Sequence, residues 1–159
     1  MRILQMQVNA LMRLCTAEEE SDRAAARSEV LRLLNRHSRL RSDPEYLIRE
    51  LLLELGTPDH LLGHPYVVQA ILLVIRDRNY ISSITFSLYP QLAAMFDTTP
   101  SRIERAIRNL VEITWTKGNL EALTRCFGYT VSPDQGKPTN AVFIARIANI
   151  VSQQLRQAA

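Results

Sequence analysis

The sequence predicts an all-helical protein. Apolar residues recur every three or four positions through most of the 159 residues, which is the period of an amphipathic helix. Residues that begin helices (Ser, Thr, Asp, Asn) and residues that end them (Gly, Pro) separate these stretches at helix-like intervals. No stretch shows the convincing alternation of apolar and polar residues that is typical of a half-buried β-strand.

Composition and charge indicate one ordinary domain with a small extension. The formal net charge of +3 and the isoelectric point near 9.1 are too mildly basic to imply nucleic acid by themselves. Nearly all basic residues are Arg, because Lys117 and Lys137 are the only lysines. Cys15 and Cys126 lie far apart and suggest no disulfide or metal framework, so we expect a cytoplasmic protein. We expect neither a signal peptide nor a membrane-spanning stretch.

The beginning of the chain, residues 1–42, is expected to form a helical hairpin. Its helices are Met1–Cys15 and Ala17–Arg36, the second of which begins at the capping box Thr16-x-x-Glu19. Two short amphipathic helices cannot bury both apolar stripes alone, so the hairpin should pack on the rest of the chain or on a second copy. The expected stripes are Leu4, Val8, Leu11, Met12 and Cys15, and then Ala26, Val30, Leu33 and Leu34.

A polar and basic segment, Arg36–Asp43, is the expected internal boundary, with a second domain over residues 43–159. The next helix begins at Asp43-Pro44 and ends at Gly56. Gly63-His-Pro65 breaks the chain again before a helix over Tyr66–Arg78. The expected inward residues of these two helices are Leu47, Ile48, Leu51, Leu52 and Leu55, followed by Val67, Ala70, Ile71 and Val74.

The chain then enters a candidate helix-turn-helix. A short apolar segment, Ile81–Tyr89, leads into a short helix over Tyr89–Phe96. Four residues, Asp97–Pro100, connect it to a longer central helix that reaches Trp115. A connection of this length fits helix-turn-helix geometry.

The central helix has two faces of opposite character. Thr99 can cap it, Pro100 suits its first turn, and Ser101-x-x-Glu104 matches a capping box. The apolar face carries Ile103, Ala106, Ile107, Leu110 and Thr114, and the polar face carries Ser101, Arg102, Glu104, Arg105, Arg108, Asn109 and Glu112. Arg can recognise guanine or phosphate, Glu cytosine and Asn adenine, so the polar face suits DNA reading; it equally suits an ordinary solvated surface.

Two more helices complete the predicted fold. Asn119 caps a short helix that runs to Phe127, and Gly and Pro residues predict a loop over Gly128–Pro138. Thr139 caps a last helix that extends to about Arg156. The expected buried residues of this helix are Phe143, Ile144, Ile147, Ile150 and Val151.

No catalytic, metal or cofactor site is expected. His60 and His64 have a metal-like spacing, but Gly63 and Pro65 oppose a shared helix, so two loop histidines are expected instead. Gly136-Lys-Pro-Thr139 lacks the upstream Gly of a phosphate-binding loop, and its Pro removes a needed amide. An enzyme is therefore not the expected class.

Six strings of residues occur in order along Leu51–Leu155: Gly56-Thr-Pro-x-His60, Ser83-Ile-Thr-x-x-Leu-Tyr-Pro90, Thr98-Thr-x-Ser-Arg-x-Glu-Arg-Ala-Ile-Arg108, Trp115-x-x-Gly-Asn119, Phe127-Gly-Tyr-Thr-Val-Ser132 and Lys137-Pro-Thr-Asn-x-x-Phe-Ile-Ala145. Together they resemble the DNA-binding effector domain of the sporulation response regulator family, that of stage-zero sporulation protein A. The resemblance implies a compact six-helix domain with a helix-turn-helix. It also implies binding of a short DNA element, as tandem or paired copies, to activate or repress transcription.

The resemblance also implies which residues contact double-stranded DNA. Arg102 and Glu104 would face base edges, whereas Arg105 and Arg108 would contact phosphate or neighbouring bases. His60, in a loop, would touch the DNA backbone. The full expected set is Ser101, Arg102, Glu104, Arg105, Arg108, Asn109 and His60.

The chain departs from the family pattern in two places. Leu62 stands where the family has a basic residue, which would weaken one backbone contact. The segment before Leu51 is too short and too helical for a receiver domain. Three alternatives stay open for its role: a hairpin that builds a homodimer, which we favour, a docking site for another protein, or a boundary within a longer gene. The alternative function is a protein-interaction module that binds RNA polymerase or a family member without reading DNA.

Overall fold

The computed structural model describes residues 2–16, 20–128 and 136–158, and every regular element in these ranges is helical. The prediction of an all-helical protein is confirmed. The chain divides into two compact units, Met1–Asp43 and Pro44–Gln157. We call the first unit the hairpin and the second the helical domain.

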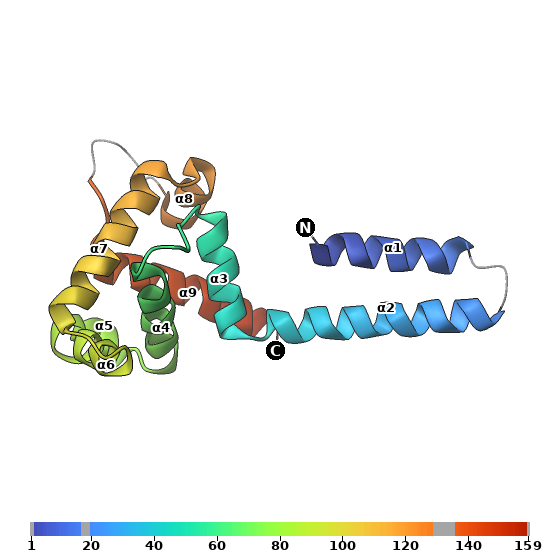
Figure 1. The fold of residues 1–159 in the computed structure, drawn as a ribbon, viewed down its shortest axis with the longest axis horizontal. Helices are drawn as coiled ribbons and strands as arrows, with labels where there is room; N and C mark the ends of the chain where they lie inside the picture. Colours follow the sequence, from blue (N-terminus) through green and yellow to red (C-terminus); the bar gives the residue numbers. More distant parts are fainter. Residues whose placement is uncertain (1, 17–19, 129–135, 159) are drawn as a thin grey trace. The chain divides into compact units, whose positions relative to one another are not determined.

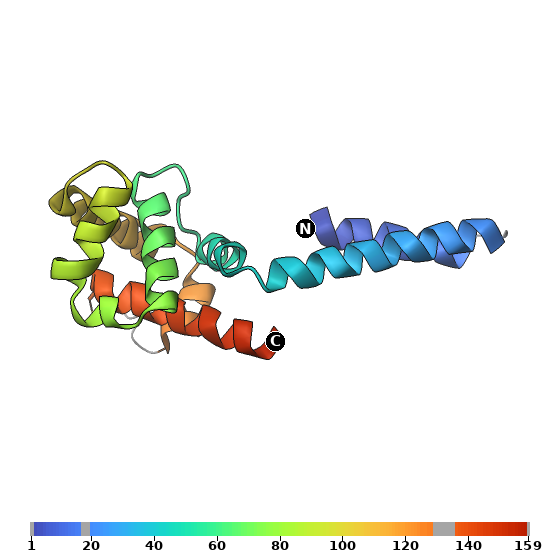
Figure 2. The same ribbon diagram turned by 90° about the horizontal axis from the view of Figure 1, so that it is seen from below.

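The hairpin consists of α1 (Arg2–Thr16) and α2 (Glu20–Arg41), which lie side by side and antiparallel (Figures 1 and 2). The buried apolar residues described in it are Ala10, Ala26 and Leu33. Residues of the predicted α1 stripe are instead exposed: Val8 by 43%, Leu11 by 49% and Met12 by 61%. The predicted stripe is therefore the outer face of α1, and the predicted capping box before α2 falls largely on residues 17–19, outside the described residues.

The helix α2 is longer than the sequence predicted. The sequence predicted an internal boundary over Arg36–Asp43 and a helix that ends near Arg36, but α2 continues through most of this segment to Arg41. Arg is a strong helix former, so a basic run without Gly or Pro extends a helix. Only Ser42 and Asp43 separate α2 from α3.

The helical domain contains the predicted helices and two further short segments (Figure 1). The additional segments are α5 and the π-helix η1, which form where only an apolar stretch was expected. The elements in chain order are α3 (Pro44–Glu54), α4 (Gly63–Arg76), α5 (Asn79–Ser82), η1 (Ile84–Leu88), α6 (Tyr89–Met95), α7 (Pro100–Lys117), α8 (Leu120–Phe127) and α9 (Asn140–Ala158).

The start of α4 corrects a second prediction. Gly63-His-Pro65 was expected to break the chain, yet these residues form the first turn of α4. Pro is tolerated there, because the first amides of a helix have no intrahelical acceptor. Gly63 is required by packing: a Cβ at this position would lie 2.3 Å from the carbonyl oxygen of Ala106 in α7. The beginning of α4 therefore rests directly on the middle of α7.

The end of α3 is joined to the end of α7. Gly56 has a φ of +74°, and the amide of Thr57 donates to the Leu52 carbonyl at 2.9 Å, which closes the helix in a Schellman motif. The amide of Asn119 donates to the carbonyl of Leu55 at 3.0 Å. A Cβ on Gly118 would lie 2.4 Å from that same Leu55 oxygen. The C-terminal ends of the two helices thus meet backbone to backbone.

One core holds the helical domain together, and α7 runs along it. The predicted inner residues of α7 are buried, with Ile103, Ile107, Leu110 and Thr114 at 0% exposure and Ala106 only partly covered. The largest fully buried side chains include Phe143, Ile48, Leu52, Leu55, Ile71, Leu88, Leu92 and Leu123. No helix in the described ranges is long and apolar enough to cross a membrane.

Candidate nucleic-acid interface

Two consecutive helices, α6 and α7, form the helix-turn-helix (Figure 1). The turn begins at Asp97, which has a left-handed φ of 48°, and the amide of Thr98 donates to the Ala93 carbonyl at 3.0 Å. Thr99 caps α7 as predicted, because its hydroxyl accepts from the Arg102 amide at 3.4 Å. The connection is therefore Phe96–Thr99, one residue earlier than predicted.

The predicted capping box at Ser101 is wrong. Ser101 lies inside the first turn of α7, because Thr99 already occupies the capping position. The side chain of Glu104 reaches forward along the helix to an ion pair with Arg108. A Glu one turn before an Arg is a favourable pair on a helix surface, so this spacing also explains the sequence.

The polar face of α7 is exposed between Ser101 and Asn109, where Glu104 is partly buried. Ser101, Arg102, Arg105, Arg108 and Asn109 are all exposed, while Ile107 and Leu110 on the other face are fully buried. Five predicted DNA-binding residues line one surface hollow: Ser101, Arg102, Glu104, Arg105 and Arg108. Because the apolar face of α7 packs into the core, the predicted DNA-binding residues on the opposite face of the helix point towards solvent.

The charges on this face are positive in balance. Glu104 pairs with Arg108, and Glu112 pairs with Lys137, whose Nζ lies 3.0 Å from the Glu112 carboxylate. No ion pair involves Arg102 or Arg105 within the described parts of the chain. The two guanidiniums therefore remain available to an anionic partner, and neither carboxylate is left uncompensated.

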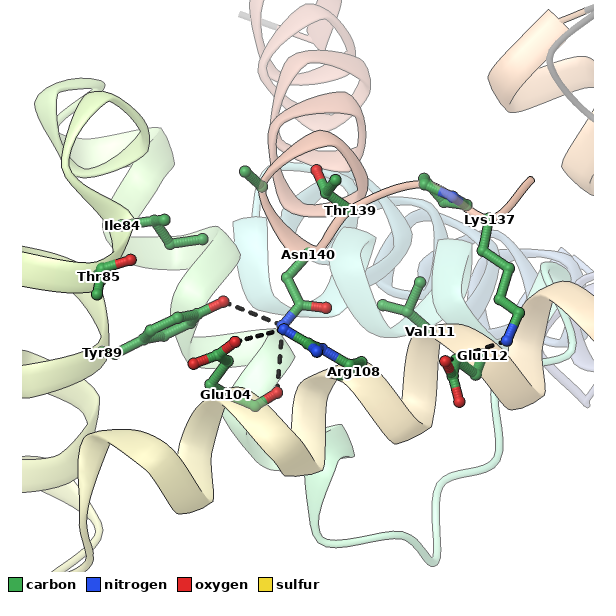
Figure 3. A pocket seen from close by; sticks show the side chains of 12 residues that line it. Ile84, Thr85, Tyr89, Glu104, Arg108, Val111, Glu112, Lys137, Thr139 and Asn140 are labelled. Atoms are coloured by element: carbon green, nitrogen blue, oxygen red, sulfur yellow. Dashed lines mark hydrogen bonds and ion pairs between the residues drawn. The ribbon is translucent and has the colours of Figure 1, made fainter. Parts of the chain in front are cut away.

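A buried amide holds α7 against the rest of the domain (Figure 3). The Nδ2 of Asn140, at the start of α9, donates to the hydroxyl of Tyr89 in α6 at 3.0 Å. The same Nδ2 donates to the backbone carbonyl of Glu104 at 3.2 Å. Burial raises the pKa of Tyr89, an effect opposed by its bond from Asn140, so the phenol stays neutral. Asn140 therefore links both helices of the helix-turn-helix to α9.

A second link joins the segment before α9 to the later part of α7. Lys137 reaches across to Glu112, and Figure 3 shows this pair on the same side of α7 as Asn140. Further along, Trp115 of α7 meets Phe127 edge to face at 5.4 Å, and Phe127 stacks on Phe143 of α9 at 5.6 Å. The polar face of α7 is thus presented by a helix that is fixed along its length.

The two predicted loop histidines differ in environment. His60 is in a loop with its side chain 77% exposed, as a contact to a DNA backbone would require. His64 is not in a loop; it lies in the first turn of α4 and is only 7% exposed. Burial, and then the positive charge of Arg49, lower the pKa of His64, partly opposed by Asp59. Within the described residues, no cluster of His, Cys, Asp or Glu could hold a metal ion.

The linking residues were not predicted from the sequence. Asn140 follows the predicted cap Thr139 and reads as an ordinary first-turn residue, so nothing local indicates its long-range bonds. The Glu104–Arg108 pair, in contrast, could have been predicted from its spacing of four residues.

Residues 48–151 match the family model described as "Sporulation initiation factor Spo0A C terminal". The match spans well over half of the chain. It includes both helices of the helix-turn-helix and Asn140 at the start of α9.

Proposed function

This chain belongs to the Spo0A C-terminal family of sporulation regulators, whose members are DNA-binding effector domains, and we propose that it regulates transcription by binding double-stranded DNA sequence-specifically through the polar face of α7. The proposed place of action is the cytoplasm, where that DNA would be. No catalytic activity or cofactor is part of the proposal.

One observation carries this proposal: Arg102 and Arg105 are exposed on the second helix of a helix-turn-helix and have no carboxylate partner within the described residues. In this motif the second helix enters the major groove, with residues near its N-terminus closest to base edges. Arg102 lies in the first turn of α7. This position favours a bidentate contact from Arg102 to the edge of a guanine.

The remaining residues of the face have supporting roles in the proposal. Glu104 would accept from a base edge, and Arg105 and Arg108 would meet phosphates or neighbouring bases. Because Glu104 and Arg108 are paired in the free protein, DNA binding would exchange that pair for contacts to DNA. Ser101 and Asn109 flank these residues, and His60 would touch the DNA backbone. Leu62, which is 74% exposed, would add no charge beside it.

We also propose that the active form is a homodimer. Two linked copies that engage two half-sites bind far more tightly than one copy, provided that the spacing allows both to engage. In this proposal the hairpin brings two helical domains together.

The competing function is a protein-interaction module that binds RNA polymerase or a family member. Single exposed apolar residues outside α7, such as Phe86 at 88% and Leu120 at 66%, are ordinary on a protein surface and do not by themselves favour a protein contact. Such a contact is compatible with DNA binding by the same domain. The competing function therefore differs in one respect only, that α7 would not read DNA.

A titration by fluorescence anisotropy tests the proposal. The full chain is titrated with a duplex that carries an element bound by family members and with a random duplex, at two salt concentrations. We expect tighter binding to the first duplex by at least about tenfold, and weaker binding to both at higher salt. Equal and weak binding to both duplexes would contradict sequence-specific recognition and favour the protein-interaction module.

A further inference from the structure

The outer face of α1 carries exposed apolar side chains. Val8, Leu11 and Met12 share one face by their spacing and are between 43% and 61% exposed. Ala10, on the opposite side of the helix, is only 3% exposed. Among the described side chains of α1, Ala10 is therefore buried, and these three larger apolar side chains are exposed to solvent.

This outer face also lacks charge. The stretch Ile3–Met12 contains no Asp, Glu, Lys or Arg. Among its described side chains, the polar ones are Gln5 and Asn9, and the Gln5 amide donates to Asn9 Oδ1 at 3.4 Å. A solvated helix face ordinarily carries charged residues. A helix that lies on a membrane surface ordinarily carries Lys or Arg along its polar side, whereas the basic residues of α1, Arg2 and Arg13, lie near its two ends, and Arg13 pairs with Glu29 of α2 at 3.6 Å. The face therefore has the character of a protein interface.

The helical domain does not need this face to complete its own core. The buried cluster of that domain is built only from residues between Ile48 and Val151, and the partly buried residues around it lie between Leu47 and Leu155. Its exposed large apolar residues lie singly on different elements: Leu53, Leu62, Phe86, Met95, Leu120 and Val142. Among the described residues, the helical domain therefore shows no continuous apolar surface on one element like the outer face of α1. The same face on a second copy of the chain is such a surface.

We infer that the outer face of α1, formed by Val8, Leu11 and Met12, is the homodimer interface and that it binds the same face of a second copy. A twofold axis places one face against itself, and an uncharged face meets its own copy without repulsion. Two hairpins joined in this way close a four-helix bundle, in which Leu31 and Leu34 of α2 can also be covered. This inference supplies the interface for the homodimer of the proposed function, and it rests on that function only for the dimer's role on DNA.

The length of α1 agrees with such an interface. At 1.5 Å per residue, its 15 residues extend about 22 Å. A stable interface takes about 800 Å² from each partner, which two adjacent helices of about this length can supply. By contrast, the hairpin alone buries only Ala10, Ala26 and Leu33 among its described apolar residues.

Light scattering on the full chain tests the inference. We expect the wild-type protein at tens of micromolar to show twice the chain mass of 18.1 kDa. Leu11→Glu should halve the measured mass, because two carboxylates would face each other across the axis. The matched control is Leu53→Glu, at an apolar residue of α3 that is 70% exposed, and it should remain a dimer.

A second measurement covers the case in which Leu11→Glu simply unfolds the hairpin. The helical signal of the wild-type protein is melted at several concentrations, and the dimer predicts a melting temperature that rises with concentration. Three results would overturn the inference. The first is a wild-type protein that is monomeric at tens of micromolar, and the second is a Leu11→Glu variant that is still a dimer. The third is binding of the wild-type protein to phospholipid vesicles that Leu11→Glu abolishes. A monomer that still binds DNA specifically would overturn only the interface, whereas a dimer without DNA specificity would overturn only the proposed function.

Discussion

The helical domain and the hairpin are both made of amphipathic helices, but they differ in what covers the apolar faces. In the helical domain, α7 packs Ile103, Ile107 and Leu110 into a core at 0% exposure. In the hairpin, α1 packs Ala10 inward and leaves Leu11 and Met12 about half exposed. Most helical stability in proteins comes from packing an apolar face. The comparison teaches that the helical domain is stabilised by its own packed core, whereas we propose that a second copy covers the apolar face of the hairpin.

The largest expected effect breaks the helical domain from within. Ile107→Ala should destabilise that domain by about 2–5 kcal/mol, because it removes a fully buried side chain and leaves a cavity. Urea unfolding followed by circular dichroism measures this change. Leu53→Ala is the matched truncation at an exposed apolar residue of α3, and it should change the unfolding free energy by less than about 0.5 kcal/mol. If Ile107→Ala melted like the parent, the assignment of the two faces of α7 would be reversed.

A smaller loss is expected at the link between α9 and the helix-turn-helix. Asn140→Ala removes the donor to the Tyr89 hydroxyl and to the Glu104 carbonyl, and leaves both acceptors without it. We expect a loss of about 1–3 kcal/mol in unfolding free energy. Asn149→Ala, on the exposed side of the same helix, should change stability by less than about 0.5 kcal/mol. Equal effects of the two variants on the unfolding free energy would contradict the structural role of Asn140.

The next effect concerns DNA rather than stability. Arg108→Ala should weaken binding to specific and random duplexes to a similar extent, and reduce the salt slope by about one unit if Arg108 meets a phosphate. Anisotropy titrations at several salt concentrations measure the slope. The control is Arg76→Ala, an exposed Arg at the end of α4, which should keep the parental slope. A slope that Arg108→Ala leaves unchanged would exclude the phosphate contact.

The smallest expected effect is a pH dependence of the helical domain. Because the pKa of His64 is lowered in the folded protein, the unfolded chain binds its proton more readily near pH 6. Stability should therefore be fully present above the unfolded pKa of about 6.5, and should decrease as the pH falls towards the folded pKa. Urea unfolding at pH 7.5 and pH 5.5 measures the difference. His64→Gln should reduce it, whereas the exposed His60→Gln should retain it; the opposite pattern would contradict this account.

Helix positions in the helical domain could be predicted well because local signals and packing agree there. The cap at Thr99 and the apolar period through Leu110 both appear in α7 as predicted. Gly63 was misread as a breaker because its role depends on Ala106, forty-three positions away in sequence, whose carbonyl leaves no room for a side chain. A contact of that range has no local signature.

The hairpin could be predicted less well, since few of its described side chains are buried. The apolar stripe of α1 was identified from its period. A period shows which residues share a helix face, but it does not show what that face packs against. The polar and basic composition of the segment after Arg36 indicated a boundary between domains, although Arg favours a helix and α2 continues there. The candidate DNA-binding face was found from residue types at helical spacing, while the Asn140 link that positions it required the structure.

The measurement that tests the central claim most directly is the base preference of Arg102→Ala. Binding of the full chain to a set of duplexes, each with one base pair of the element changed, is compared for the parent, Arg102→Ala and the control Arg78→Ala, an exposed Arg outside the helix-turn-helix. The account predicts that Arg102→Ala loses about 1–3 kcal/mol on the preferred duplex and loses its preference at one position, while Arg78→Ala retains the parental pattern. If Arg102→Ala kept both the affinity and the preferences of the parent, the polar face of α7 would be a solvated surface and not the part of this protein that reads DNA.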